Sequence, residues 1–172
     1  MSATKAWIDT IEDISNFSGT EHEFAQALTN LIKGEKDFKN VLEEESFSTP
    51  TGILRPDITA ERTINGNWKK LIIECVVPAP MTAQRLHATA QHLAMYKTNI
   101  PDTDVICAFP GALSKSGKEV FSSQNIEVWD AEEIASMIVI QERESGKLID
   151  FGFKDSDQDV EASPRFQERC RL

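Results

Sequence analysis

The sequence predicts an α/β fold, a mixed β-sheet with helices on its faces. Three observations predict this class. Two amphipathic helical patterns open the chain, a β-hairpin pattern with an Asn-Gly turn follows, and helices then alternate with short apolar strands. The length of 172 residues is that of one ordinary domain. We therefore expect a single domain over residues 1–153, followed by an acidic, disordered tail over residues 154–172.

Two helices are expected before the sheet. Residues 4–15 place apolar side chains at helical spacing. Thr20 has the character of an N-cap, because Glu23 follows three residues later and an apolar stripe begins at residue 24. Gly34 is a suitable helix stop.

The middle of the chain has the pattern of a hairpin. Residues 39–47 are a candidate first strand, and residues 53–64 and 68–77 are the two arms of a hairpin. Residues 65–67, Asn-Gly-Asn, supply the turn because Asn and Gly tolerate positive φ. The second arm is apolar on both faces, as in a central strand, and Glu74 is the charge inside its apolar end.

The second half of the chain alternates between the two element types. In order, we expect a helix over 82–97, a strand over 104–109, a helix over 114–123, a strand over 126–129 and a last helix capped by Asp130. Trp68 and Trp129 are interpreted as core residues rather than base-stacking residues.

The charge distribution limits the classes of partner. The net charge is −10, which argues against a strongly basic nucleic-acid-binding surface. Residues 51–110 are the least acidic third, with 6 Lys or Arg against 5 Asp or Glu. The chain has no apolar run of membrane-spanning length and no signal-peptide pattern, so we expect a cytoplasmic protein. Cys75 and Cys107 lie in apolar runs and are expected to be reduced core residues.

Asp57 and Glu74 are the candidate chemical centre. They lie 17 positions apart on the two arms of the hairpin, and a turn centred on Gly66 places Asp57 near residue 75. Two carboxylates in apolar surroundings repel each other and are costly to bury, whereas a divalent cation removes both penalties. Mg²⁺ or Mn²⁺ is expected, with the backbone carbonyl of Cys75 as a further ligand. The alternative is that Glu74 pairs with Arg55, Arg62 or Arg85.

The segments Arg55-Pro56-Asp57-Ile58 and Leu71-Ile72-Ile73-Glu74-Cys75-Val76 resemble the PD-(D/E)xK superfamily of nucleases. The resemblance covers about residues 20–140 and implies a restriction-endonuclease-like mixed sheet flanked by helices on both faces. It also implies that Asp57 and Glu74 bind Mg²⁺.

Further residues at the places of family features are Glu23 before the sheet, and Gln84 and Gln91 on the helix after it. The capping box explains Glu23 equally well, and a solvated helix face explains the glutamines.

The chain departs from the family at the motif lysine, whose place Val76 occupies. Three side chains are candidates for a replacement base: Lys70 on the same strand face, and Arg85 and His92 on the next helix. Lys70 lies four residues from Glu74, roughly 13 Å along a strand.

Three functions are consistent with these residues. The first is a divalent-metal-dependent nuclease that hydrolyses phosphodiester bonds of nucleic acid, DNA before RNA, with homodimerisation as a common feature of such enzymes. The second is a catalytically degenerate relative that acts as a binding or interaction module, which Val76 favours. The third is an acidic inhibitor that mimics DNA charge, which the net charge of −10 favours.

Overall fold

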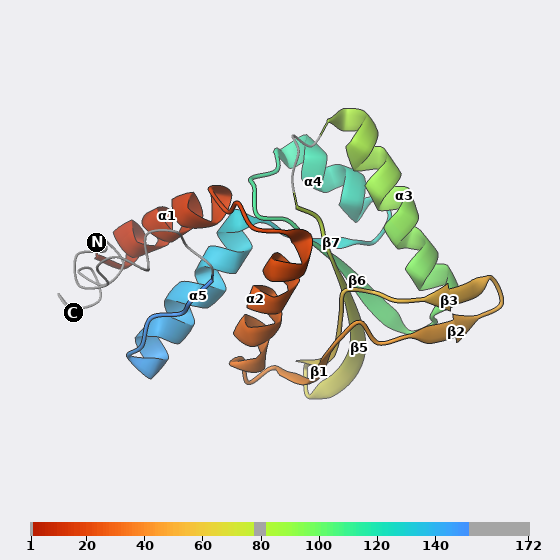
Figure 1. Ribbon diagram of the computed structural model, residues 1–172, viewed down its shortest axis with the longest axis horizontal. Helices are drawn as coiled ribbons and strands as arrows, with labels where there is room; N and C mark the ends of the chain where they lie inside the picture. The colour runs from red at the N-terminus through yellow and green to blue at the C-terminus, as the bar shows by residue number, and fades with distance from the viewer. Residues whose placement is uncertain (1, 78–81, 152–172) are drawn as a thin grey trace.

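The computed structural model describes residues 2–77 and 82–151. Within these ranges the chain forms five helices and seven strands (Figure 1). In chain order they are α1 (Ser2–Ser15), α2 (Glu21–Lys33), β1 (Phe38–Glu43), β2 (Phe47–Thr49), β3 (Gly52–Leu54), β4 (Ile58–Ile64), β5 (Asn67–Cys75), α3 (Ala83–Asn99), β6 (Thr103–Ala108), α4 (Lys115–Ser122), β7 (Glu127–Trp129) and α5 (Ala131–Ser145). The expected tail over residues 154–172 and the segment 78–81 lie outside the described residues.

Five strands form one mixed sheet in the order β1-β4-β5-β6-β7. The pairs β1–β4 and β4–β5 are antiparallel, and the pairs β5–β6 and β6–β7 are parallel. Strands β2 and β3 form a separate two-stranded hairpin that projects beside the end of α3 (Figure 1). The predicted α/β class with a mixed sheet is confirmed.

The sheet carries a core on each face. Alternate residues of β5 point to opposite sides, because side chains alternate along a strand. Leu71, Ile73 and Cys75 pack with α1, α2 and α5, whereas Ile72 and Val76 pack with α3 and α4. Helices therefore flank both faces of the sheet, as the sequence predicts (Figure 1). No helix in the described part of the chain is long and apolar enough to cross a membrane.

The turn between β4 and β5 fixes the register of the hairpin. Asn65 and Gly66 have φ of 52° and 81°, the left-handed conformation that a two-residue hairpin turn requires. Ile64 pairs with Asn67 and Ile58 pairs with Ile73. This register differs by one residue from the expected one, so Asp57 continues the ladder opposite Glu74 rather than Cys75.

Two expected strands are each broken in the structure. The strand expected over 53–64 divides into β3 and β4 at Arg55-Pro56-Asp57, because proline has no N–H to offer a ladder. The strand expected over 39–47 divides into β1 and β2, and Glu44 at the break has a φ of 54°. Both breaks occur beside Asp57, whose carbonyl accepts a hydrogen bond from the Glu44 N–H at 3.1 Å.

The helix caps follow the sequence closely. Thr20 and Glu23 form the predicted capping box of α2, and Asp130 caps α5 by accepting hydrogen bonds from the N–H groups of Glu132 and Glu133. Helix α2 ends before Gly34, where the added Cβ of another residue would lie 2.5 Å from the Gln141 amide oxygen. Any side chain at position 34 would therefore have to displace the Gln141 amide of α5, whereas the φ of Gly34, −81°, makes no demand for glycine.

The expectation for the two tryptophans is right for one and wrong for the other. Trp129 is 6% exposed and belongs to the core. Trp68 is 42% exposed, because it lies next to the hairpin turn beyond the reach of the covering helices. Lys39 lies over its ring instead, 4.2 Å from the ring centroid. Cys75 and Cys107 are buried and free, as predicted.

Candidate metal centre at the carboxyl end of the sheet

Asp57 and Glu74 lie side by side where β4 begins and β5 ends. The N–H of Asp57 donates to Glu74 Oε1 at 3.1 Å, and the N–H of Cys75 donates to Asp57 Oδ2 at 2.8 Å. Each carboxylate thus accepts a hydrogen bond from a main-chain N–H group that would donate to a neighbouring strand if the pairing were regular. Because Pro56 interrupts the strand, side chains replace the ladder at this point.

The pKa values of both carboxyl groups are raised. Burial, followed by the negative charge of Asp57, raises the pKa of Glu74 to about 8. The pKa of Asp57 is also raised, chiefly by burial; the hydrogen bond from the Cys75 N–H opposes this, as does the nearby His22. In the described part of the chain neither carboxylate forms an ion pair with Lys or Arg. The pair therefore retains a proton near neutral pH unless a cation binds.

Glu21, and not Glu23, is the acidic residue of α2 that faces this pair. Partial desolvation, followed by the charge of Asp57, raises the pKa of Glu21, while the Val77 N–H and Arg85 act to lower it. Both side chains are exposed, and the Glu23 carboxylate accepts the Thr20 N–H at 3.0 Å. Two positions along a helix differ by about 200° of rotation, so these residues point in opposite directions. The structure thus shows Glu23 in the capping box, which is the alternative considered for this residue, and Glu21 is the acid of this helix turn whose pKa the charge of Asp57 affects.

Tyr96 is a site residue that the sequence reasoning missed. Its hydroxyl donates to Glu74 Oε1 at 2.9 Å, and its side chain is 6% exposed. Burial and the charge of Glu74 raise its pKa. The sequence did contain a signal that Tyr96 is buried, because it continues the apolar stripe of α3 after Leu86, Ala90 and Leu93. A tyrosine on a buried stripe needs a partner for its hydroxyl.

The remaining candidates separate into near and distant residues. Arg85 lies at the edge of the centre, where it donates to the Val77 carbonyl at 3.4 Å and its charge acts on Glu21. Lys70 is directed away from Glu74, because its ammonium contacts Glu45 at 3.0 Å and lies 4.7 Å from the centroid of the Phe47 ring.

Three other polar residues on α3 have exposed side chains. Gln84 and Gln91 are exposed. His92 is exposed as well, with its ring centroid 5.8 Å from that of Tyr96.

The arginine partners that were considered for Glu74 are engaged elsewhere. Arg62 pairs with Asp104 and Glu127, and the Arg55 side chain donates to the Ser46 hydroxyl at 3.2 Å. The alternative of a buried Glu74–arginine pair is therefore wrong for these two residues.

Comparisons with solved structures identify the class of fold. No protein-family model and no curated protein sequence matches the chain. The MspJI restriction endonuclease, solved with a 27-mer oligonucleotide, superposes with a TM-score of 0.51 at 14% identity over 97% of this chain and 39% of that chain. The fold is restriction-endonuclease-like.

Two further solved structures are similar. A protein of unknown function, AF1548, has a TM-score of 0.51 at 13% identity over 64% of this chain and 58% of that chain. Can2 from Sulfobacillus thermosulfidooxidans, solved with cyclic tetra-adenylate, has a TM-score of 0.48 at 17% identity over 70% of this chain and 33% of that chain. This chain thus spans less than two thirds of the length of each of the three structures.

Val76 is the residue at which the resemblance to the nucleases led us to expect a lysine. Its side chain lies on the same face as Glu74 and packs against the core beneath α3 and α4. Its N–H donates to the Ala108 carbonyl at 2.9 Å, which extends the pairing of β5 with β6. An aliphatic group therefore fills the position, and the backbone around it is regular.

The donor set fits a hard divalent cation that uses few protein ligands. The described residues contain no group of three or more His, Cys, Asp or Glu side chains arranged to hold a metal. Asp57 and Glu74 offer two carboxylates, and Mg²⁺ is commonly held by one or two carboxylates together with water and phosphate oxygens. The Cys75 thiol is buried in the core and its pKa is raised, mainly by burial, so only its carbonyl remains a candidate ligand.

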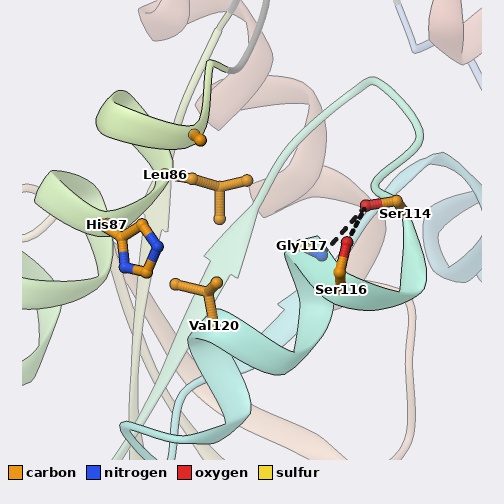
Figure 2. A pocket seen from close by; sticks show the side chains of 7 residues that line it. Leu86, His87, Ser114, Ser116, Gly117 and Val120 are labelled. Atoms are coloured by element: carbon orange, nitrogen blue, oxygen red, sulfur yellow. Dashed lines mark hydrogen bonds between the residues drawn. The ribbon is translucent and has the colours of Figure 1, made fainter.

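A pocket of about 350 Å³ lies between the first turns of α3 and α4 (Figure 2). Leu86 and His87 of α3 face Ser114, Ser116 and Val120 across it. The Ser114 hydroxyl accepts the N–H of Gly117 at 3.1 Å, as an N-cap does. Nearby on α4, Lys118 is paired with the buried Asp130 at 3.1 Å. The pocket thus has apolar walls, an imidazole and two hydroxyl groups.

Proposed function

We propose that this restriction-endonuclease-like domain is a divalent-metal-dependent nuclease in which Asp57 and Glu74 hold the ion. The observation that carries the proposal is the pairing of these two carboxylates without a Lys or Arg partner among the described residues. Stability alone gives no reason to place two acids in this arrangement, because burial and mutual repulsion both raise their free energy. A bound cation offsets both terms.

The residues around the pair have complementary roles in this proposal. Asp57 and Glu74 are the protein ligands, and the Cys75 carbonyl is a third oxygen donor. A bound Mg²⁺ or Mn²⁺ lowers the pKa of water and stabilises the charge that develops on a phosphodiester during hydrolysis. Arg85 is the basic side chain at the edge of the centre, where it can attract a phosphate. It is the best placed of the three candidates for the role of the missing lysine.

Nucleic acid is the proposed substrate, and DNA is the first form to test. The fold likeness to MspJI, whose structure contains an oligonucleotide, supports this class of substrate. The acidic balance of the chain, −10, limits non-specific binding to polyanions. A substrate must therefore gain its affinity at the metal centre and at a few basic groups near it.

A catalytically degenerate binding module is the second candidate, and Val76 favours it. An aliphatic side chain at this position cannot donate a hydrogen bond to water or phosphate. If Arg85 does not compensate, the domain would retain ion and nucleic-acid binding without cleavage.

Cleavage of plasmid DNA and single-stranded DNA with Mg²⁺ or Mn²⁺ tests the proposal. Asp57→Ala and Glu74→Ala should abolish nicking, and Arg85→Ala should reduce it. Glu23→Gln is the control at an exposed acid, because glutamine preserves the capping box. Absence of cleavage by the wild type, together with metal-dependent DNA binding, would select the degenerate module. Absence of both cleavage and metal binding would reject the metal centre altogether.

A further inference from the structure

Tyr96 connects α3 to the candidate metal centre through one hydrogen bond. Its hydroxyl lies 2.9 Å from Glu74 Oε1, and its ring is buried in the core between the sheet, α3 and α4. We propose that Tyr96 is a positioning residue of the metal centre that orients the Glu74 carboxylate toward the ion. The proposal rests on the metal-binding role proposed for Asp57 and Glu74.

The geometry at Glu74 supports an orienting role. Glu74 Oε1 accepts two hydrogen bonds, one from the main-chain N–H of Asp57 on β4 and one from the Tyr96 hydroxyl on α3. A carboxylate held by two donors from different elements cannot rotate without losing one of them. Oε1 is therefore committed to the protein, and the second oxygen remains for an ion shared with Asp57. Groups that hold a ligand in this way typically change metal affinity 10- to 100-fold when they are removed.

The choice of residue supports the same conclusion. The other buried positions on the stripe of α3 are Leu86, Ala90 and Leu93, so packing alone would accept an aliphatic side chain. A phenol in this place brings a hydroxyl that must find a partner when it is buried. Glu74 meets this requirement, and Tyr96 in turn gives Glu74 a donor that carries no positive charge. A neutral donor orients the carboxylate without competing with a cation for its charge.

The alternative role for this bond is purely structural, an anchor of α3 on β5. The two roles differ in what is lost when the hydroxyl is removed. An anchor would change the free energy of unfolding and leave metal affinity unchanged. A positioning residue changes metal affinity even when the variant is fully folded.

Calorimetric titration with Mn²⁺ separates the roles. Tyr96→Phe keeps the ring and removes the hydroxyl, and it should weaken Mn²⁺ binding roughly tenfold or more. Met95→Ala changes the exposed neighbour on the same helix and should bind as the wild type does. Equal affinity of the wild type and Tyr96→Phe would overturn the Tyr96 inference alone. Absence of Mn²⁺ binding by the wild type would instead reject the proposed centre, and the role of Tyr96 with it.

A second measurement avoids any variant of Tyr96. The chain contains one tyrosine, so 3-fluorotyrosine labels Tyr96 alone and gives a single fluorine resonance. Addition of Mg²⁺ should shift this resonance in a saturable way, with the affinity that calorimetry gives for Mg²⁺, and Asp57→Ala should remove the shift. An unchanged resonance in a protein that binds Mg²⁺ would show that the ion does not act through the Tyr96–Glu74 bond.

Discussion

The two ends of the five-stranded sheet place carboxylates in opposite electrostatic surroundings. At the amino ends of β6 and β7, Asp104 and Glu127 surround Arg62, with N···O distances of 3.4 and 3.0 Å, and Lys69 contacts Asp104 at 2.9 Å. At the carboxyl end of β5, Glu74 instead meets a second acid. The same sheet thus pairs its acids with Arg and Lys at one end, and at the other it brings together two acids that no Lys or Arg of the described residues contacts.

The pKa directions record this difference. Partial burial acts to raise the pKa of Asp104, but the hydrogen bond and charge of Lys69, with those of Arg62, lower it overall. Burial and Asp57 together raise the pKa of Glu74. Asp104 and Glu127 are paired with cations of the fold, whereas no Lys or Arg among the described residues pairs with Asp57 or Glu74. This difference between the two ends is the reason why we propose the end with Asp57 and Glu74 as the functional one.

The largest expected change in the free energy of unfolding is at Arg62, which pairs with Asp104 and Glu127. Arg62→Met retains the apolar stem and removes the charge that Asp104 and Glu127 share, so it should lower the free energy of unfolding by about 2 kcal/mol. Lys69→Met is the control, since Lys69 is half exposed and should cost about 0.5 kcal/mol. Urea unfolding at neutral pH measures both. Equal costs would mean that Arg62 is not the centre of the network.

Removal of a charge at the end with Asp57 and Glu74 should raise the free energy of unfolding and not lower it. In EDTA at neutral pH, Glu74→Gln should raise the free energy of unfolding by about 1 kcal/mol, because a neutral glutamine removes the cost of keeping the Glu74 carboxyl protonated in the folded state. The glutamine oxygen can still accept the hydrogen bonds from Tyr96 and the Asp57 N–H. Thermal unfolding of the two proteins provides the test. A less stable variant would mean that the carboxylate pair contributes to stability without an ion.

The stability of the metal-free protein should also depend on pH at this end. The folded pKa of Glu74 is about 8 against an ordinary value of 4.5, so the folded state holds a proton that the unfolded state has lost between these values. Stability present below pH 4.5 is therefore lost as the pH rises toward 8. The difference between the wild type and Glu74→Gln in EDTA isolates this contribution. A difference that is constant over this range would contradict the raised pKa.

Asp104 should make the free energy of unfolding depend on pH in the opposite direction. Its folded pKa lies below the ordinary value of 3.8, so its contribution is present above this value and is lost as the pH falls through the folded pKa. Asp104→Asn should thus cost stability at neutral pH and converge with the wild type in acid. Acid titrations of both proteins by circular dichroism would detect convergence, and parallel curves would argue against the Lys69 and Arg62 contacts as its source.

The smallest effect concerns the start of α2. Glu21→Gln should weaken Mn²⁺ binding about two- to threefold, because one negative charge near Asp57 is removed. Glu23→Gln should leave Mn²⁺ affinity unchanged, and glutamine preserves the capping box. A larger loss in Glu23→Gln than in Glu21→Gln, measured by calorimetry, would reverse the assignment of these two side chains.

Most of the fold was predictable because its signals are local. The Asn65-Gly66 turn, the Thr20–Glu23 capping box and the Asp130 cap depend on residues within a few positions of each other. The breaks at Glu44 and Pro56 were missed, although the acidic run over residues 43–45 and the proline are local signals for them. The projecting β2–β3 hairpin was missed together with these breaks.

The candidate site was predictable only as far as strand pairing determines it. The hairpin pattern brought Asp57 and Glu74 together with an error of one residue in register. Which side chains approach this pair from the helices depends on the rotation of α2 and α3 about their axes. That rotation turned Glu21 rather than Glu23, and Tyr96 rather than Gln91, toward the centre.

The sequence by itself determined the α/β class, the order of the elements and the hairpin that carries two acids to one end of the sheet. These features follow from hydrophobic periodicity and turn chemistry, which act over short stretches of chain. The tertiary structure alone decided that Arg62 and Lys70 pair elsewhere, that the Tyr96 hydroxyl donates to Glu74, and that no Lys or Arg in the described residues pairs with the two carboxylates. Such contacts join residues distant in the chain, and only the packing of helices on the sheet sets which of them meet.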